Sequence, residues 1–250
     1  MKYPHGFWII GLALGMSAVS AAEKSAETAW AGLVGDLGER AAFAYVENDA
    51  TLPNVLIYGD SISIGYTPGV RTALKGRANV YRVHLNGGPS GSFIGKFDTM
   101  ESTMRAPDMA GHWDFAWDIV HVNVGLHDLK YVNERGKLDL EAGRQVATIA
   151  EYQANLRRII AHLRNAAPKA KLIFALTTKV PPESNGRHEN AERAYNDAAM
   201  AVLKDFPEIG INDLRTASLP YEQPGNVHFK PAGIAAQAEH VANVIATCLR

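Results

Sequence analysis

The sequence of 250 residues has a single cysteine, Cys248, so neither an intrachain disulfide nor a cysteine metal cluster can form. It also lacks an excess of either charge, because 25 Lys and Arg stand against 26 Asp and Glu, a formal charge of −1. A nucleic-acid-binding protein needs a basic excess for phosphate contacts, so we expect no nucleic-acid partner. The 47% of hydrophobic residues is ordinary for a globular protein and argues against a disordered chain.

Long hydrophobic runs are scarce too. The apolar run at residues 7–16 is well short of the roughly 20 residues that span a bilayer. It follows Lys2 and precedes small residues at 17–22, which is the layout of a secretory signal peptide. We predict a signal peptide at 1–22, cleaved after Ala22 or Ser20, and a periplasmic or secreted protein without membrane contact beyond export. An uncleaved membrane anchor is the alternative interpretation.

Apolar runs of strand length alternate with helical patterns along the rest of the chain. The expected strands cover 54–58, 79–83, 119–124, 171–176 and 210–214, and the expected helices cover 27–45, a stretch ending near Lys75, 139–166, 189–204 and the C-terminal segment. This alternation implies a parallel sheet with helices on both faces. The predicted fold class is therefore α/β, a three-layer α/β/α sandwich with a parallel, flavodoxin-like five-stranded sheet. We expect an N-terminal extension at 23–52 and one domain at 53–250.

Ligands of such sheets bind beyond the carboxyl ends of the strands. Ser61 follows the first predicted strand, a glycine cluster at 87–91 follows the second, and His127 and Asp128 follow the third. The unusual polar residues therefore gather where a site is expected.

Two sequence blocks carry a family resemblance. The block Gly59-Asp60-Ser61 resembles the first motif of the SGNH (GDSL-type) hydrolases, and residues 227–233, with His228, resemble the last motif. The resemblance spans about 53–248 and implies that 53–250 is an SGNH hydrolase domain. It implies that Ser61 is the nucleophile and that His228 is its general base.

The resemblance also implies three donors to the oxyanion: the Ser61 N–H, a glycine N–H after the second strand, and an asparagine side chain after the third. Gly91 is the expected glycine, with Gly88 as second choice. The third block has His127 in place of the asparagine, while Asp128 after it keeps the family pattern. A neutral imidazole can donate one N–H, so we expect His127 to serve and to make the site sensitive to pH near 6.5.

A second departure concerns the acid that orients the histidine. The family places an aspartate three residues before it, where this chain has Gly225. Three alternatives follow: Asn226 or a backbone carbonyl orients His228, Glu222 folds back to it, or the enzyme works as a Ser–His dyad.

The sequence thus predicts an exported serine ester hydrolase that removes acetyl or other short acyl groups from a saccharide or small-molecule ester, without a cofactor. A metal site from His121, His127 and Asp128 is considered and not expected, because their spacing is not that of a helical zinc pair. The alternatives are a lipase or thioesterase for longer acyl chains and a non-catalytic binding protein with the same fold. Five aromatic residues are candidates for a substrate rim or for the core: Tyr66, Phe93, Trp113, Trp117 and Tyr221.

Overall fold

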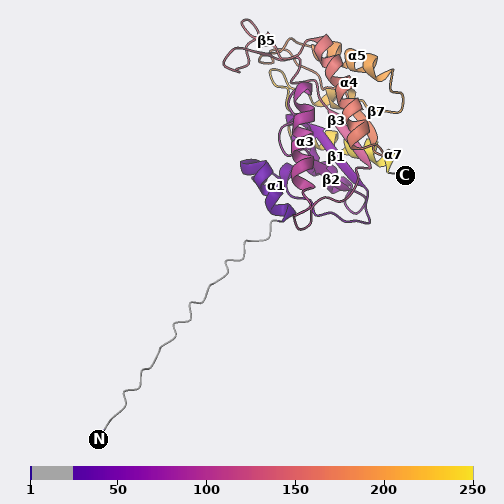
Figure 1. Cartoon of the computed structure of the whole chain (residues 1–250). Coiled ribbons are helices and arrows are strands. Elements are labelled where there is room, and N and C mark those ends of the chain that lie inside the picture. Colours follow the sequence, from indigo (N-terminus) through magenta and orange to yellow (C-terminus); the bar gives the residue numbers. More distant parts are fainter. Residues whose placement is uncertain (2–24, 250) are drawn as a thin grey trace.

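A computed structural model describes Met1 and residues 25–249 of the chain (Figure 1). The predicted signal peptide lies outside the described segment. The centre of the fold is a sheet of five strands in the order β2-β1-β3-β6-β7, and every neighbouring pair is parallel. The strands are β1 (Asn54–Gly59), β2 (Asn79–Arg82), β3 (Ile119–Asn123), β6 (Lys171–Ala175) and β7 (Gly210–Asn212). The chain leaves β1 toward β2 and later returns to β3 on its other side, which opens a crevice at their carboxyl ends.

Helices cover both faces of the sheet, as the alternating side chains of β3 show. His121 faces α2 (Ser61–Ala73), where the Tyr66 ring meets it edge-on at 6.3 Å, and α2 packs against α7 (Pro231–Cys248). Val122 faces the other way, toward α4 (Ile149–Ala166), which packs against α5 (Glu192–Leu203). On that same face, α3 (Phe93–Met104) places the Phe93 ring 3.9 Å from that of Tyr58. The three-layer α/β/α prediction is therefore confirmed.

Some predicted boundaries are wrong. The helix expected from 139 begins at Ile149, because Thr148 and Glu151 form a capping box at its N-terminus. The residues before it form a short hairpin of β4 (Tyr131–Val132) and β5 (Arg144–Gln145). The helix expected at 27–45 is split into α1 (Ala26–Val34) and two 3₁₀ turns, Gly35–Glu39 and Ala41–Phe43. The helix α3 was not predicted, and α6 (Leu214–Ser218) and a 3₁₀ turn (Leu219–Tyr221) follow β7.

The segment 25–53 packs onto the β2 side of the molecule and shares its hydrophobic core. The Trp30 indole donates to the Phe43 carbonyl over 2.7 Å, and the buried Arg82 guanidinium lies 4.5 Å from the centre of the Phe43 ring. Figure 1 shows α1 beside α3, and the two helices are in contact. This segment thereby covers a charged side chain that also braces the site described below.

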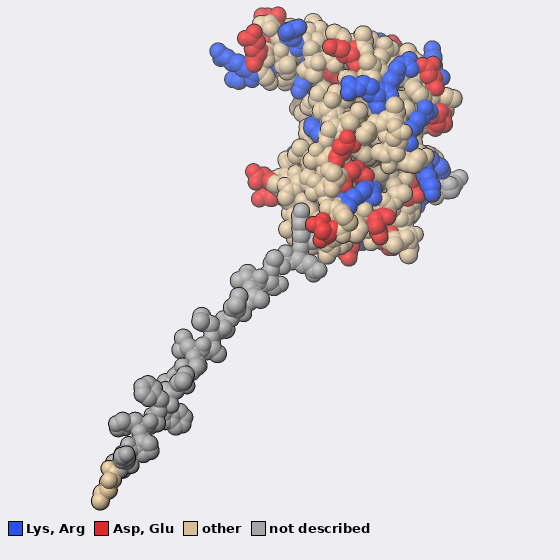
Figure 2. Space-filling model, viewed as in Figure 1, with Lys and Arg blue, Asp and Glu red and all other residues tan. Residues whose placement is uncertain are grey.

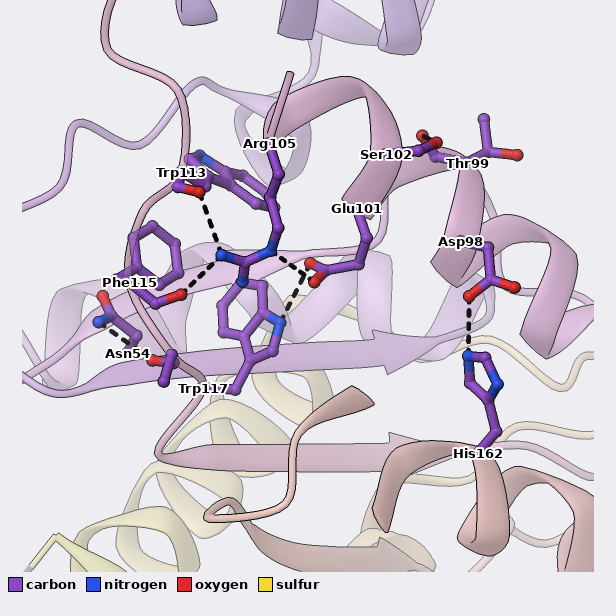
Figure 3. Close-up of polar contacts among 11 residues, drawn as sticks. Asn54, Asp98, Thr99, Glu101, Ser102, Arg105, Trp113, Phe115, Trp117 and His162 are labelled. Carbon is purple, nitrogen blue, oxygen red and sulfur yellow. Dashed lines mark hydrogen bonds and ion pairs between the residues drawn. The ribbon is translucent and has the colours of Figure 1, made fainter. Parts of the chain in front are cut away.

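A polar cluster holds the chain segment that leads into β3 (Figure 3). Arg105, at the end of α3, donates to the carbonyls of Trp113 and Phe115 and pairs with Glu101 over 2.7 Å. Glu101 also accepts from the Trp117 indole over 3.1 Å. These bonds fix the entry to β3 and lie away from its carboxyl end.

The surface carries both charges, and in Figure 2 the Lys and Arg side chains are interspersed with Asp and Glu. Among the described residues no helix is both long and apolar enough to cross a lipid bilayer.

Candidate active site

Ser61 is the first residue of α2 and is delivered there by β1 through the turn at Gly59 and Asp60. The Asp60 carboxylate caps the helix by accepting from the Ile62 N–H over 2.9 Å. A Cβ at Gly59 would lie 2.8 Å from the Ser63 side chain, so only glycine fits there. Buried Arg82 donates to the Gly59 carbonyl over 3.2 Å and to the Ser63 hydroxyl over 2.9 Å. The hydrogen bonds from Arg82 therefore stabilise the turn that presents the Ser61 hydroxyl.

The structure brings His228 to Ser61 across 167 positions of sequence, with 2.9 Å between His228 Nε2 and Ser61 Oγ. His228 lies in the loop that leads into α7, at the open rim of the crevice. A separation of 2.9 Å is a normal hydrogen-bond length and allows the ring to take the hydroxyl proton.

The proton positions on the His228 ring follow from its neighbours. Asn226 Oδ1 accepts from the His228 backbone N–H over 2.9 Å and lies 3.1 Å from His228 Nδ1. A backbone N–H only donates, so the atom it meets on Asn226 must be the amide oxygen, and Nδ1 must carry a proton to bond to it. Nε2 is then unprotonated and accepts the Ser61 O–H. The Asn226 amide thus holds the tautomer that a general base requires.

The second alternative, in which Glu222 folds back to His228, has no supporting contact in the described residues. The Glu222 carboxylate pairs with Lys179 over 2.8 Å and makes no bond to His228. Gly225, which stands where the family has its aspartate, adopts φ +71°, a conformation that favours glycine. Its N–H donates to the Pro182 carbonyl over 2.9 Å. The turn that replaces the aspartate therefore leads directly into Asn226, whose oxygen lies 3.1 Å from His228 Nδ1.

The electrostatic surroundings of His228 favour its neutral form. Its partial burial, and then the nearby Arg187 guanidinium, lower the pKa of the imidazole below its ordinary value. The ring is accordingly available as a base down to lower pH than a free histidine.

The two glycine candidates differ in what their N–H groups do. The Gly88 N–H donates to Asn86 Oδ1 over 3.0 Å and is therefore occupied. Gly91 is an exposed residue of the 3₁₀ turn Ser90–Ser92, and its N–H makes no hydrogen bond within residues 25–249. This difference favours Gly91, the first choice from the sequence, as the oxyanion donor.

His127 follows β3 in a tight turn that Gly125 makes possible, since Gly125 has φ +140° and its Cβ would clash with the Thr177 side chain. The Lys130 ammonium lies 3.2 Å from His127 Nδ1. An ammonium only donates, so Nδ1 accepts, and the ring proton sits on Nε2. His127 is thus a neutral imidazole with one N–H donor.

The expected pH sensitivity of His127 is wrong. Burial, together with Lys130, Arg187, Lys96 and His228, lowers its pKa to about 3. His127 therefore stays neutral throughout the range in which an ordinary histidine titrates, and its N–H remains available in weak acid.

Asp60 and Asp128, the two aspartates in the motif blocks, are buried, and their carboxylates accept hydrogen bonds from neighbouring turns. Both oxygens of Asp128 accept from the Ser90 N–H, each over 3.0 Å, and one also accepts from the Ser90 hydroxyl. Asp128 thereby ties the turn that carries His127 to the turn that carries Gly91. Burial raises the pKa of Asp128 and of Asp60 to about 6.

Three cationic residues around the site were missed in the sequence. Arg187, in the loop after β6, donates through Nε to the Leu126 carbonyl over 3.2 Å, next to His127. Lys96, on α3, donates to the Asn86 carbonyl over 2.7 Å and to that of Gly87 over 3.1 Å. Of these three residues, only Lys130 lies close to a motif, three residues after His127. Arg187 lies in a loop without a recognisable sequence pattern, so nothing in the sequence links it to the site.

Two sets of candidates remain, the metal ligands and the aromatic residues. Within residues 25–249 no group of three or more His, Cys, Asp or Glu is arranged to hold a metal ion. Of the five aromatic candidates, only Tyr221 is exposed; the others are buried core residues, namely Tyr66, Phe93, Trp113 and Trp117.

A parallel sheet of this order, with a serine and a histidine in hydrogen-bond contact at its carboxyl edge, defines a hydrolase-type α/β protein. The family model of the GDSL-like Lipase/Acylhydrolase family matches residues 57–236. The chain belongs to this family, whose members are ester hydrolases, and the SGNH resemblance is confirmed.

Solved structures share the fold at low sequence identity. A putative GDSL-like lipase from Parabacteroides merdae is 12% identical over 82% of this chain and 99% of its own, with a TM-score of 0.60. Axe2, an acetylxylan esterase from Geobacillus stearothermophilus, is 15% identical over 80% and 96%, with a TM-score of 0.58. A carbohydrate esterase family 2 enzyme from Corynascus thermopiles (Myceliophthora fergusii) is 19% identical over 79% and 66%, with a TM-score of 0.54. No curated protein sequence matches the chain.

Proposed function

We propose that the protein is an exported serine esterase that removes acetyl or other short acyl groups from a carbohydrate. The observation that carries the proposal is the 2.9 Å contact of His228 Nε2 with Ser61 Oγ, in a ring whose tautomer Asn226 holds. Export rests on the signal-peptide pattern at 1–22.

In the proposed reaction His228 Nε2 takes the Ser61 proton as Oγ attacks the ester carbonyl. The N–H groups of Ser61, Gly91 and His127 receive the negative charge on the carbonyl oxygen. The C–O bond to the alcohol then breaks, and His228 returns the proton to the leaving alcohol. Water, deprotonated by the same ring, attacks the acyl-enzyme, and the acid leaves as Ser61 recovers its proton.

Two features support a short acyl group on a large alcohol. His228 stands at an exposed rim, which leaves room for a bulky alcohol. The apolar cavity between the sheet and α4 is lined by Val122, Leu156 and Phe174 among others, and neither Ser61 nor His228 lines it. A long acyl chain on Ser61 would therefore not enter that cavity. Among the structural neighbours, Axe2 is named as an acetylxylan esterase.

The test is p-nitrophenyl acetate turnover by the wild-type protein, by Ser61→Ala and by Ser102→Ala. Ser102 is an exposed residue of α3 whose hydroxyl bonds only the Thr99 carbonyl, so it is the matched control (Figure 3). We expect Ser61→Ala to lower kcat at least about a thousandfold, since it removes the nucleophile, and Ser102→Ala to leave kcat unchanged.

The same assay separates the alternatives. Equal, slow turnover by wild type and Ser61→Ala would favour a non-catalytic binding protein. An ester series from acetate to palmitate distinguishes the proposed short-chain esterase, whose kcat/KM falls with length, from a lipase or thioesterase, whose kcat/KM rises.

A further inference from the structure

Three cationic side chains surround the His127 turn, and none of them forms a salt bridge with a carboxylate of the described residues. Each is anchored to a segment that carries a predicted oxyanion donor: Lys130 to His127, Arg187 to the carbonyl of Leu126, and Lys96 to the carbonyls of Asn86 and Gly87. Within residues 25–249 none of the three forms an ion pair. They come from three separate parts of the chain, so the fold itself gathers them around His127, and Arg187 also acts on His228.

These cations retain unused donors. Lys130 has three N–H donors and uses one on His127, and Lys96 uses two of its three. Arg187 has five, of which Nε bonds Leu126 and Nη1 bonds the Asn185 carbonyl over 3.2 Å, so Nη2 is unused within the described residues. None of these unused nitrogens is a buried atom without a partner, so they are open to solvent and to a substrate group that would replace water.

Two buried acids, Asp60 and Asp128, lie near the cations but form no salt bridge with them: Asp60 favours the charged form of Arg187, and both acids favour that of Lys130. Asp60 and Asp128 are at most 1% exposed, and their oxygens bond to Ile62 and Ser90. Burial and then Lys130 lower the pKa of Lys96, whereas burial and then Arg187 lower the pKa of Lys130, and Asp60 and Asp128 offset part of that second shift. Three cations thus stand against two buried carboxylates, which leaves an excess of positive charge around the His127 turn.

We propose that Arg187, Lys130 and Lys96 form a subsite for a negatively charged group on the substrate, so that the natural substrate is an acylated acidic saccharide. This rests on the proposed function. An acetyl group carries no charge, so the negatively charged group must belong to the saccharide, which is the leaving alcohol. A uronate carboxylate and a sulfate ester present the same chemistry to guanidinium and ammonium donors.

The experiment compares two substrates that differ only in charge: a methyl glucuronoside with one acetyl group, and its glucuronamide with the acetyl group on the same hydroxyl. We expect wild type to favour the carboxylate by about tenfold in kcat/KM, the scale of one charge-assisted hydrogen bond. Arg187→Gln should bring this ratio close to one, and Arg187→Lys should keep most of it. A sulfated, acetylated glucoside tests whether sulfate is preferred to carboxylate.

Arg158→Gln is the matched control, because it removes the same charge from an exposed position of α4 that makes no ion pair, and should leave the ratio unchanged. If Arg187→Gln does not fold, added NaCl gives the answer in wild type: it should lower kcat/KM for the carboxylate and not for the amide.

A ratio near one in wild type, with Ser61-dependent hydrolysis of both substrates, overturns the subsite and leaves the esterase standing. An equal loss on both substrates in Arg187→Gln also overturns it, because the cations then serve only the oxyanion. If neither substrate nor p-nitrophenyl acetate is hydrolysed in a Ser61-dependent way, both proposals fail.

Discussion

Replacing Asn226 with aspartate should make the protein a faster enzyme. The Asn226 oxygen already accepts from the His228 N–H and Nδ1–H, while its amide NH₂ makes no hydrogen bond within residues 25–249. Asn226→Asp therefore keeps both bonds, loses none and adds a negative charge against the imidazolium that forms in the transition state. Asn226→Ala removes both bonds and should lower kcat.

The gain follows from Coulomb's law. Unit charges 4 Å apart attract by about 1 kcal/mol in water and about 4 kcal/mol at an effective dielectric of 20. The rim position of His228 lies between these limits, which gives about 1–2 kcal/mol, or roughly tenfold in kcat at about 1.4 kcal/mol per factor of ten.

The same charge moves the pH profile. The pKa of His228 is lowered by partial burial and by Arg187, so in wild type the acid limb of kcat/KM lies below the ordinary histidine value. A carboxylate favours the protonated ring and should move this limb upward by about one unit. Glu222→Gln is the control, since Glu222 pairs with Lys179, and should change neither kcat nor the limb. An Asn226→Asp enzyme no faster than wild type, with an unmoved limb, would refute the assigned role of Asn226.

Two further predictions concern the buried histidines. His127→Ala should lower kcat by about 10²–10³, the usual loss of one oxyanion donor, whereas His127→Asn supplies another N–H and should stay within about tenfold of wild type on p-nitrophenyl acetate. His121 is fully buried, accepts from the Asn212 amide over 2.9 Å, and has its pKa lowered by burial to about 4. In the unfolded chain the His121 imidazole is protonated near pH 6.5. The free energy of unfolding contributed by neutral His121 is therefore complete above pH 6.5 and is lost as the pH falls toward 4, by up to about 1.4 kcal/mol per pH unit. Urea unfolding at pH 7, 6 and 5 should show a shallower decline in His121→Gln, and parallel declines would contradict this reasoning.

The sheet was predictable because its strands are buried on both faces and read as continuous apolar runs. In β1 all six residues are buried, and so are all five in β3. The helix α3 was not predicted, although it buries Phe93, Phe97, Met100 and Met104 at helical spacing. The capping box at Thr148 was likewise present in the sequence and would have corrected the start of α4.

The site was only partly predictable, for a physical reason. Ser61 and His228 lie in motifs that the chain itself displays, whereas their contact depends on how α7 packs against α2. The role of Asn226 depends on the left-handed turn at Gly225. Arg187 and Lys96 reach the site through long side chains from a loop and a helix. No local sequence pattern predicts that these two side chains lie near His127.

The most direct test of the central claim is covalent labelling with a fluorophosphonate, which reacts with an activated serine. Digestion and mass spectrometry of the labelled protein locate the adduct. The account predicts one adduct, on Ser61, that forms fast in wild type, slowly in His228→Ala and at no other serine in Ser61→Ala. An adduct on another serine, or equal rates in wild type and His228→Ala, would contradict it.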